Sequence, residues 1–143
     1  MEPVVVSEGL TKSFTPEAGV FDLDLLIPPG KIVGFIGPSG SGKTTTVRLL
    51  TGLLRPDRGS ISVLGEIPTE FDANTRARLG YMPQQAILYP DLTLTQNLRF
   101  AASLYGLGRR VRGRLGELTE FLDLDEAMDR LPTQASGGEQ RRL

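Results

Sequence analysis

The sequence predicts an α/β fold organised around a phosphate-binding loop. Residues 37–45 read Gly-Pro-Ser-Gly-Ser-Gly-Lys-Thr-Thr and complete the pattern G-x-x-x-x-G-K-[ST]. An apolar run at 31–36 precedes the loop, and a helix is expected at 45–53 with its leucines and valine inward, namely Val47, Leu49, Leu50 and Leu53. We therefore expect residues 31–36 to form a buried strand of a parallel sheet, because strand, loop and helix in this order are the context in which the motif binds a nucleotide.

The residues of the loop fit the chemistry of phosphate binding. Glycines let successive backbone N–H groups converge on phosphate oxygens, and the start of a helix adds about half a positive charge. Lys43 adds a full charge for the β and γ phosphates, and the Thr44 hydroxyl is placed to ligate Mg²⁺. The alternative, a glycine-rich turn with a chance Lys-Thr pair, is disfavoured by the flanking strand and helix. The predicted nucleotide contacts in the loop are Gly37, Ser39, Gly40, Ser41, Gly42, Lys43, Thr44 and Thr45.

A first strand is expected at 4–10, where an apolar run of three valines is followed by Gly9-Leu10, and residues 20–25 and 60–65 have the alternation of half-exposed strands. The first two are expected to pair antiparallel around a turn at 15–19. Phe14 lies at the mouth of this turn. Its ring could stack on a base or close the edge of the sheet, and the spacing alone favours neither.

A short helix is expected at 71–79 with Asp72 as its cap, followed by a short strand at 81–82 that ends at Pro83. Gln84 then lies just beyond the end of a strand, where parallel sheets place residues that face a ligand. Its amide could hold a water or a metal. The alternative is an ordinary solvated glutamine in a loop.

The pattern is helical from residue 92 onward. Thr93 and Gln96 fit a capping box at the start of an apolar helical stripe. The basic run at 109–114 is better explained as the solvated start of a helix than as a nucleic-acid site, because no aromatic residues are interleaved with it.

A second capping box is expected near the end of the chain, from Ser136 to Glu139. Gly137 and Gly138 lie between these two residues and leave the first N–H groups of the helix unshielded, as an anion site requires. Such a sequence is also common at ordinary helix starts, so it carries little weight alone.

Composition restricts the function classes. The 143 residues contain 16 basic and 17 acidic side chains, which gives no reason to expect a nucleic-acid or anionic-membrane footprint. Cysteine and histidine are absent, so thiolate and imidazole metal sites are excluded. The first residues do not have the pattern of a signal peptide, and no apolar run approaches the roughly 20 residues that cross a bilayer. We therefore expect a cytoplasmic chain that meets a membrane only through a partner.

The order of these motifs resembles that of the ATP-binding subunits of ABC transporters over the whole chain. Residues 37–45 are similar to the family's Walker A motif, and residues 81–84 resemble the start of its Q-loop. Residues 135–139 resemble its Leu-Ser-Gly-Gly-Gln signature, although Ala135 replaces the usual leucine and Glu139 the usual glutamine. Phe14 falls where the family places the aromatic residue that stacks on adenine.

The resemblance implies a P-loop NTPase fold of the ABC ATPase type, with a mostly parallel core sheet, a small antiparallel sheet and a helical subdomain. Residues 1–91 would form the nucleotide-binding core with its antiparallel part, and residues 92–143 the helical subdomain. ATP and Mg²⁺ are the implied cofactors, with Gln84 acting in catalysis and, with Thr44, at the metal. The resemblance further implies contacts to ATP held by an opposite subunit from Ser136, Gly137 and Gly138.

The implied function is to couple ATP binding and hydrolysis to transport, in the direction of export, through a separate transmembrane permease subunit. A second ATP-binding subunit would complete a dimer at the inner face of the plasma membrane. Two alternatives are a nucleotide-binding fragment that does not hydrolyse ATP, and a soluble ABC ATPase that is not linked to transport. In the family, a strand ending in Asp-Glu and a later histidine follow the signature. The sequence ends at Leu143, so we expect a C-terminally truncated domain that does not turn over ATP by itself.

Overall fold

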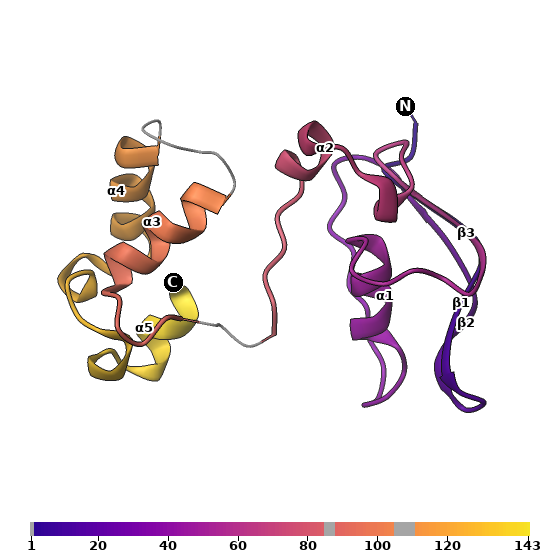
Figure 1. The fold of residues 1–143 in the computed structure, drawn as a ribbon, viewed down its shortest axis with the longest axis horizontal. Helices are drawn as coiled ribbons and strands as arrows, with labels where there is room; N and C mark the ends of the chain where they lie inside the picture. Colours follow the sequence, from indigo (N-terminus) through magenta and orange to yellow (C-terminus); the bar gives the residue numbers. More distant parts are fainter. Residues whose placement is uncertain (1, 85–87, 105–110) are drawn as a thin grey trace. The chain divides into compact units, whose positions relative to one another are not determined.

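The computed structural model of the protein describes residues 2–84, 88–104 and 111–143 (Figure 1). The chain divides into two compact units, Met1–Tyr81 and Met82–Leu143, and each is described by itself. In these described ranges, no helix has both the length and the apolar character needed to cross a membrane.

The first unit contains a three-stranded antiparallel sheet (Figure 1). Its strands are β1 (Val5–Thr15), β2 (Ala18–Ile27) and β3 (Arg58–Val63), in the order β2-β1-β3. β1 and β2 form a hairpin, which confirms the antiparallel pairing predicted for the stretches at 4–10 and 20–25.

The pairing of β1 differs along its length. On one side β2 accompanies β1 as far as Thr15, which lies opposite Ala18. On the other side the register with β3 ends where Thr11 lies opposite Arg58. Among the described residues, 12–15 of β1 therefore have a neighbouring strand on one side only.

Helix α1 (Lys43–Leu50) packs its apolar side on this sheet. Leu49 is fully buried in the core of the unit, which also contains Val5, Leu10, Val20, Ile61, Val63 and Phe71. The predicted helix at 45–53 was too long. The helix ends at Leu50, Gly52 turns the chain with a φ of +74°, and Leu53, which we expected inward, is 60% exposed.

The apolar segment at 31–36 forms no strand in this structure, and neither does the segment at 81–82. The prediction of strands there is wrong, because an apolar run becomes a strand only beside a partner and neither segment pairs with another in the described ranges. Ile32 and Ile36 are fully exposed, and Val33 is largely exposed. The small antiparallel sheet, by contrast, is present as predicted.

After β3 the chain forms a short 3-10 helix, η1 (Pro68–Glu70), and then helix α2 (Ala73–Ala77). Asp72 caps α2 as predicted, because its Oδ1 accepts a hydrogen bond of 2.7 Å from the backbone N–H of Thr75. This hydrogen bond holds the pKa of Asp72 below its usual value. The helix is shorter than the predicted span of 71–79.

The second unit is helical, as predicted from residue 92 onward (Figure 1). Thr93 and Gln96 form the expected capping box at the start of the first helix, α3. Leu94, Leu124 and Ala127 are buried apolar residues in the described part of this unit. Its elements are α3 (Leu94–Leu104), α4 (Val111–Phe121), η3 (Asp125–Ala127), η4 (Pro132–Gln134) and α5 (Gly137–Arg142).

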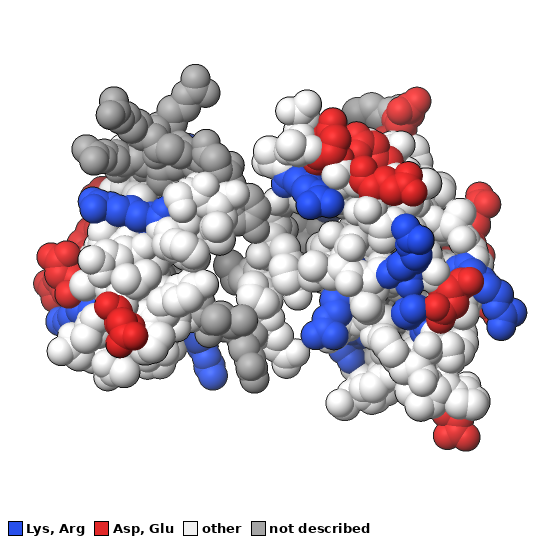
Figure 2. All heavy atoms as spheres, in the orientation of Figure 1, with Lys and Arg blue, Asp and Glu red and all other residues white. Residues whose placement is uncertain are grey.

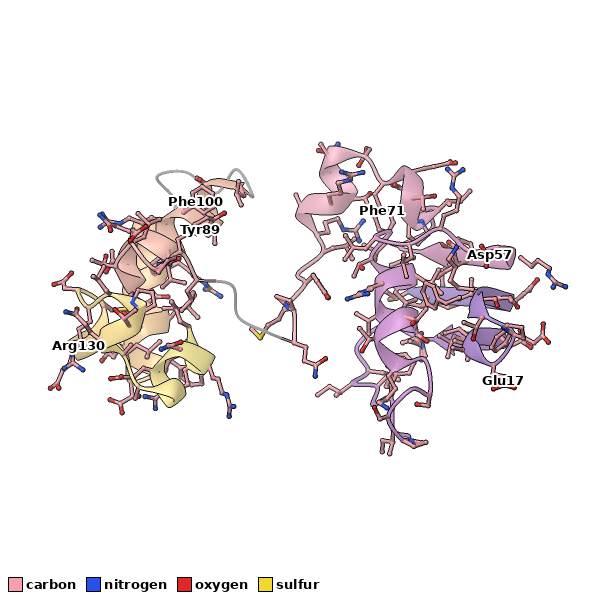
Figure 3. The ribbon with its side chains drawn as sticks, turned by 60° about the horizontal axis from the view of Figure 1, so that its bottom comes forward. Glu17, Asp57, Phe71, Tyr89, Phe100 and Arg130 are labelled. Carbon is pink, nitrogen blue, oxygen red and sulfur yellow. The ribbon has the colours of Figure 1, made fainter. Side chains whose placement is uncertain are left out.

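Asn97 ties the loop before α3 to the helix itself. It is buried, and its Oδ1 accepts a hydrogen bond of 2.8 Å from the backbone N–H of Tyr89. Its Nδ2 donates to the carbonyl oxygens of Tyr89, Leu92 and Thr93 at 2.9–3.1 Å. The Tyr89 ring also packs edge-on against Phe100 of α3, with ring centroids 5.0 Å apart (Figure 3).

Replacing Leu49 by alanine tests whether the hydrophobic core of the first unit depends on the packing of α1. Because Leu49 is fully buried, Leu49→Ala should lower the free energy of unfolding by about 2–5 kcal/mol, measured by urea denaturation. The matched control is Leu53→Ala, which removes the same atoms from an exposed side chain and should change stability by no more than about 0.5 kcal/mol. Similar losses in both variants would contradict the observed end of α1.

Candidate nucleotide-binding site

Lys43 lies inside the turn of the loop that precedes α1. Its Nζ donates hydrogen bonds of 2.7 Å to the carbonyl oxygens of both Gly37 and Pro38, and a longer one of 3.2 Å to the Ser41 hydroxyl. The first turn of α1 contains no acidic residue. A full positive charge is thus held at the N-terminal end of a helix, where the helix dipole is also positive.

The loop is pressed against the β1–β2 hairpin at one point. Gly42 has a φ of +85°, and a Cβ atom built there would lie 2.7 Å from the carbonyl oxygen of Gly19 and 2.8 Å from the Cγ2 of Val20. Any other residue at 42 would meet both a strained backbone and a backbone collision. The glycine therefore lets the loop lie directly on the start of β2.

The exposed part of the loop is polar. Ser39, Gly40, Ser41 and Thr44 are exposed, and Thr45 is half-buried. Mg²⁺ prefers oxygen ligands and usually takes only one or two from the protein, with the rest from phosphates and water. The accessible hydroxyl of Thr44, next to the Lys43 charge, fits that requirement, as the sequence predicts.

Phe14 lies near the loop through the hairpin. It follows Ser13, whose partner across the hairpin is Gly19, the residue that touches Gly42. The Phe14 ring is 57% exposed, although it belongs to a strand of the sheet. An aromatic side chain this exposed is accessible to a ligand.

Asp57 makes contacts with this hairpin that no sequence motif predicts. The carboxylate of Asp57 makes an ion pair of 2.7 Å with Lys12 and accepts a hydrogen bond of 2.9 Å from the backbone N–H of Ser13. Figure 3 labels Asp57 beside the sheet. The Lys12 ammonium and the Ser13 N–H hold the pKa of Asp57 below its usual value. Lys12 and Asp57 are 45 residues apart, and only the fold brings them together.

Gln84 and the residues resembling the signature belong to the second unit. Gln84 is exposed and lies in no helix or strand. The structure thus brings Phe14 and residues 37–45 together within one unit, and it describes Gln84 and residues 136–138 within the other.

The predicted capping box of α5 is present. The backbone N–H of Ser136 donates to Oε2 of Glu139 at 2.6 Å, and the backbone N–H of Glu139 donates to the Ser136 hydroxyl at 3.2 Å. The backbone N–H of Ser136 and, after it, the Ser136 hydroxyl hold the pKa of the Glu139 carboxyl below its usual value. The guanidinium of Arg130, labelled in Figure 3, lies 3.5 Å from Oε1 of Glu139 and contributes to the shift. The carboxylate that replaces the usual glutamine is therefore occupied by the helix cap.

The two glycines of α5 are not required by the packing of the described residues. A Cβ at Gly137 would meet no atom within 4 Å, and one at Gly138 would meet only the Ser136 hydroxyl, at 3.9 Å. The space beside both residues is open in the part of the second unit that the structure describes.

Charges of both signs are spread over the face of the molecule shown in Figure 2. Basic and acidic side chains are interspersed there, in keeping with the near balance of 16 basic and 17 acidic residues. The first part of the basic run, 109–110, lies outside the described residues.

A lysine held in a glycine loop at the start of a helix defines the chain as a phosphate-binding-loop protein. The ABC transporter family model matches residues 20–143. The chain is also similar to a solved structure described as the ATP-binding subunit of an ABC transporter, with a TM-score of 0.83 at 30% identity over 97% of this chain and 58% of the other. The chain therefore belongs to the ABC transporter family, and the predicted fold class is confirmed.

Several curated relatives are similar along almost the whole chain. A probable multidrug ABC transporter ATP-binding protein of Escherichia coli K12, YbhF, is 40% identical over 99% of this chain and 25% of its own length. The daunorubicin/doxorubicin resistance ATP-binding protein DrrA of Streptomyces peucetius is 39% identical over 97% of this chain and 42% of its own length. The sulfate/thiosulfate import ATP-binding protein CysA of Thermosynechococcus vestitus is 36% identical over 97% of this chain and 41% of its own length. The chain thus spans less than half of these proteins.

The pKa of Glu139 gives a test of the α5 cap. Because its pKa is lower in the folded chain than in the unfolded chain, the cap is fully formed above the unfolded pKa and is lost as the pH falls through the folded pKa. We expect the NMR shift of the Ser136 amide to titrate with a midpoint below 4.5, the ordinary value for glutamate. The Glu139→Gln variant should keep the cap and lose the titration. A midpoint at or above 4.5 would contradict the observed hydrogen bonds.

Proposed function

We propose that this chain is the ATP-binding part of an ABC transporter, in which ATP binding and hydrolysis drive transport through a separate membrane subunit. The observation that carries the proposal is the position of Lys43 inside the glycine loop at the start of α1. Backbone N–H groups, a helix dipole and a full charge all meet there, as the phosphates of ATP require.

Different residues of the first unit contact different parts of the nucleotide. Lys43 meets the β and γ phosphates, and the loop residues from Gly37 to Thr45 enclose them. The half-exposed ring of Phe14 stacks on adenine. Thr44 supplies a hydroxyl to Mg²⁺, and the bound ion supplies positive charge against the phosphate oxygens.

The second unit acts on a nucleotide held by another copy or a related subunit. The open space beside Gly137 and Gly138 supports this role, because a phosphate can approach the N–H groups there without meeting a side chain. Gln84 acts through its amide, which can orient a water or a metal ligand but cannot take up a proton.

The direction of transport is proposed to be export. Two relatives compared above carry names that refer to multidrug transport and to drug resistance, whereas CysA is named for import. The site described above is compatible with both directions. The assembly, a dimer of ATP-binding subunits on a permease at the inner face of the membrane, is part of the same proposal.

The first test replaces Lys43 by alanine in the whole protein. A hydrogen bond to a charged group is worth about 1.5–3 kcal/mol, so Lys43→Ala should weaken Mg-ATP binding at least about tenfold in calorimetry. Lys31→Ala is the matched control, since it removes an exposed lysine outside the loop and should leave the affinity unchanged. Equal affinity in the parent protein and Lys43→Ala would overturn the assignment of the loop.

The second test concerns the signature in the whole protein. Gly138→Asp adds a charged side chain in open space, so we expect the fold and the nucleotide affinity of each subunit to be retained. Dimerisation with a slowly hydrolysed ATP analogue should be lost, because the carboxylate opposes the phosphates across the interface. Gly113→Asp, also in open space, should leave dimerisation intact. Light scattering and calorimetry separate the two effects, and a joint loss of binding and dimerisation in Gly138→Asp would contradict the role in trans.

A further inference from the structure

The last residues of β1 have a gap in their pairing that one side chain fills. β3 stops accompanying β1 at Thr11, so the next backbone N–H on that side, at Ser13, has no strand to bind. Asp57, the residue just before β3, reaches this N–H with its Oδ2 at 2.9 Å. The carboxylate therefore continues the hydrogen bonding of β3 beyond the end of the strand.

Asp57 is bound to the hairpin at two further points. Its own backbone N–H donates to the carbonyl oxygen of Thr11 at 2.8 Å, and its Oδ1 meets the ammonium of Lys12 at 2.7 Å. Three consecutive residues of β1 are thus held by one residue from another part of the chain. Charge-assisted hydrogen bonds of this kind are roughly twice as strong as neutral ones, and two acting on adjacent residues restrict how the strand can bend.

The contacts of Asp57 lie next to Phe14 and to the point where the hairpin touches the phosphate loop. Phe14 follows Ser13 in the chain, and Gly19, the partner of Ser13 in β2, is pressed against Gly42 of the phosphate loop. One side of the hairpin end is therefore fixed by the loop and the other by Asp57. Phe14 is the next residue of β1 after these two contacts.

We infer that Asp57 is a positioning residue for base recognition: by holding Lys12 and Ser13, its carboxylate places Phe14 against the base of a bound purine nucleotide. This inference rests on the proposed function, because it requires that the loop at 37–45 binds the phosphates of that nucleotide. Asp57 itself touches neither base nor phosphate in this arrangement. Its effect passes through the backbone of β1.

The experiment compares two ligands that share the triphosphate and differ in the base. Asp57→Asn in the whole protein keeps the size of the side chain, but it replaces one of the two acceptor oxygens by an NH2 donor and removes the charge, so it can no longer serve Ser13 and Lys12 with separate oxygens or form an ion pair with Lys12. Base stacking on an aromatic side chain is worth about 1–3 kcal/mol, and part of it should be lost, so Mg-ATP should bind about five- to tenfold more weakly in calorimetry. Binding of Mg-tripolyphosphate should stay within about twofold of the parent, because the phosphate loop is untouched.

Two further variants make the result specific. In a Phe14→Ala background, Asp57→Asn should cause no additional loss of ATP affinity, since the ring it positions is gone. Glu8→Gln is the matched control: it neutralises an exposed acidic residue in the same strand, and ATP affinity should not change. If Asp57→Asn does not fold, Lys12→Gln keeps the bond from Ser13 to Asp57 and should show a smaller loss for ATP alone.

Each other outcome overturns the inference. Equal weakening of ATP and tripolyphosphate would mean that Asp57 supports the phosphate loop or the fold in general. An additive loss in the double variant would mean that Asp57 acts independently of Phe14, and an unchanged ATP affinity in Asp57→Asn and Lys12→Gln would mean that it positions nothing. The proposed function fails by a different result, namely that neither ligand binds or that Lys43→Ala does not matter. If ATP binding depends on Lys43 and Phe14 but not on Asp57, only the present inference is wrong.

Discussion

The first unit depends on the approach of two backbones, where Gly42 lies against Gly19. Gly42 has no room for a side chain at this contact, because a Cβ there would collide with the carbonyl oxygen of Gly19. Gly19 is confined separately within the hairpin, where a Cβ would collide with the carbonyl oxygen of Lys12. The phosphate loop, the start of α1 and the end of the hairpin are therefore related by main-chain contact. Main-chain contact is insensitive to side-chain rotamers, so it defines the geometry between loop and hairpin more narrowly than packing of side chains would.

Much of this structure could be predicted where the determining contacts are local. The capping boxes at Thr93 and Ser136 each involve residues three positions apart, and the Asp72 cap does the same. The hairpin joins two neighbouring stretches, β1 and β2, across a short turn. Such features follow from spacing in the sequence, because both partners lie in the same short stretch.

The predictions that are wrong or missing depend mainly on contacts between distant residues, which a local sequence pattern does not reveal. The apolar run at 31–36 led to the prediction of a buried strand, but Ile32 and Ile36 are exposed, because a hydrophobic pattern does not name the strand beside which a segment will pair. The end of α1 was misplaced because Leu53 continues the apolar spacing, whereas Gly52 with its left-handed backbone turns the chain first. The contact of Asp57 with Lys12 and Ser13 joins positions more than forty residues apart, and nothing in the residue types marks it.

The amide of Asn97 has a consequence for how the second unit can move. Its hydrogen bonds run to residues 89–93, all of them from a buried side chain on α3. Separating this loop from the helix would leave several buried donors and acceptors unpaired at once, and each would cost about 1–3 kcal/mol. We therefore expect residues 89–93 and α3 to move together as one rigid segment, so that a displacement of Tyr89 also displaces α3.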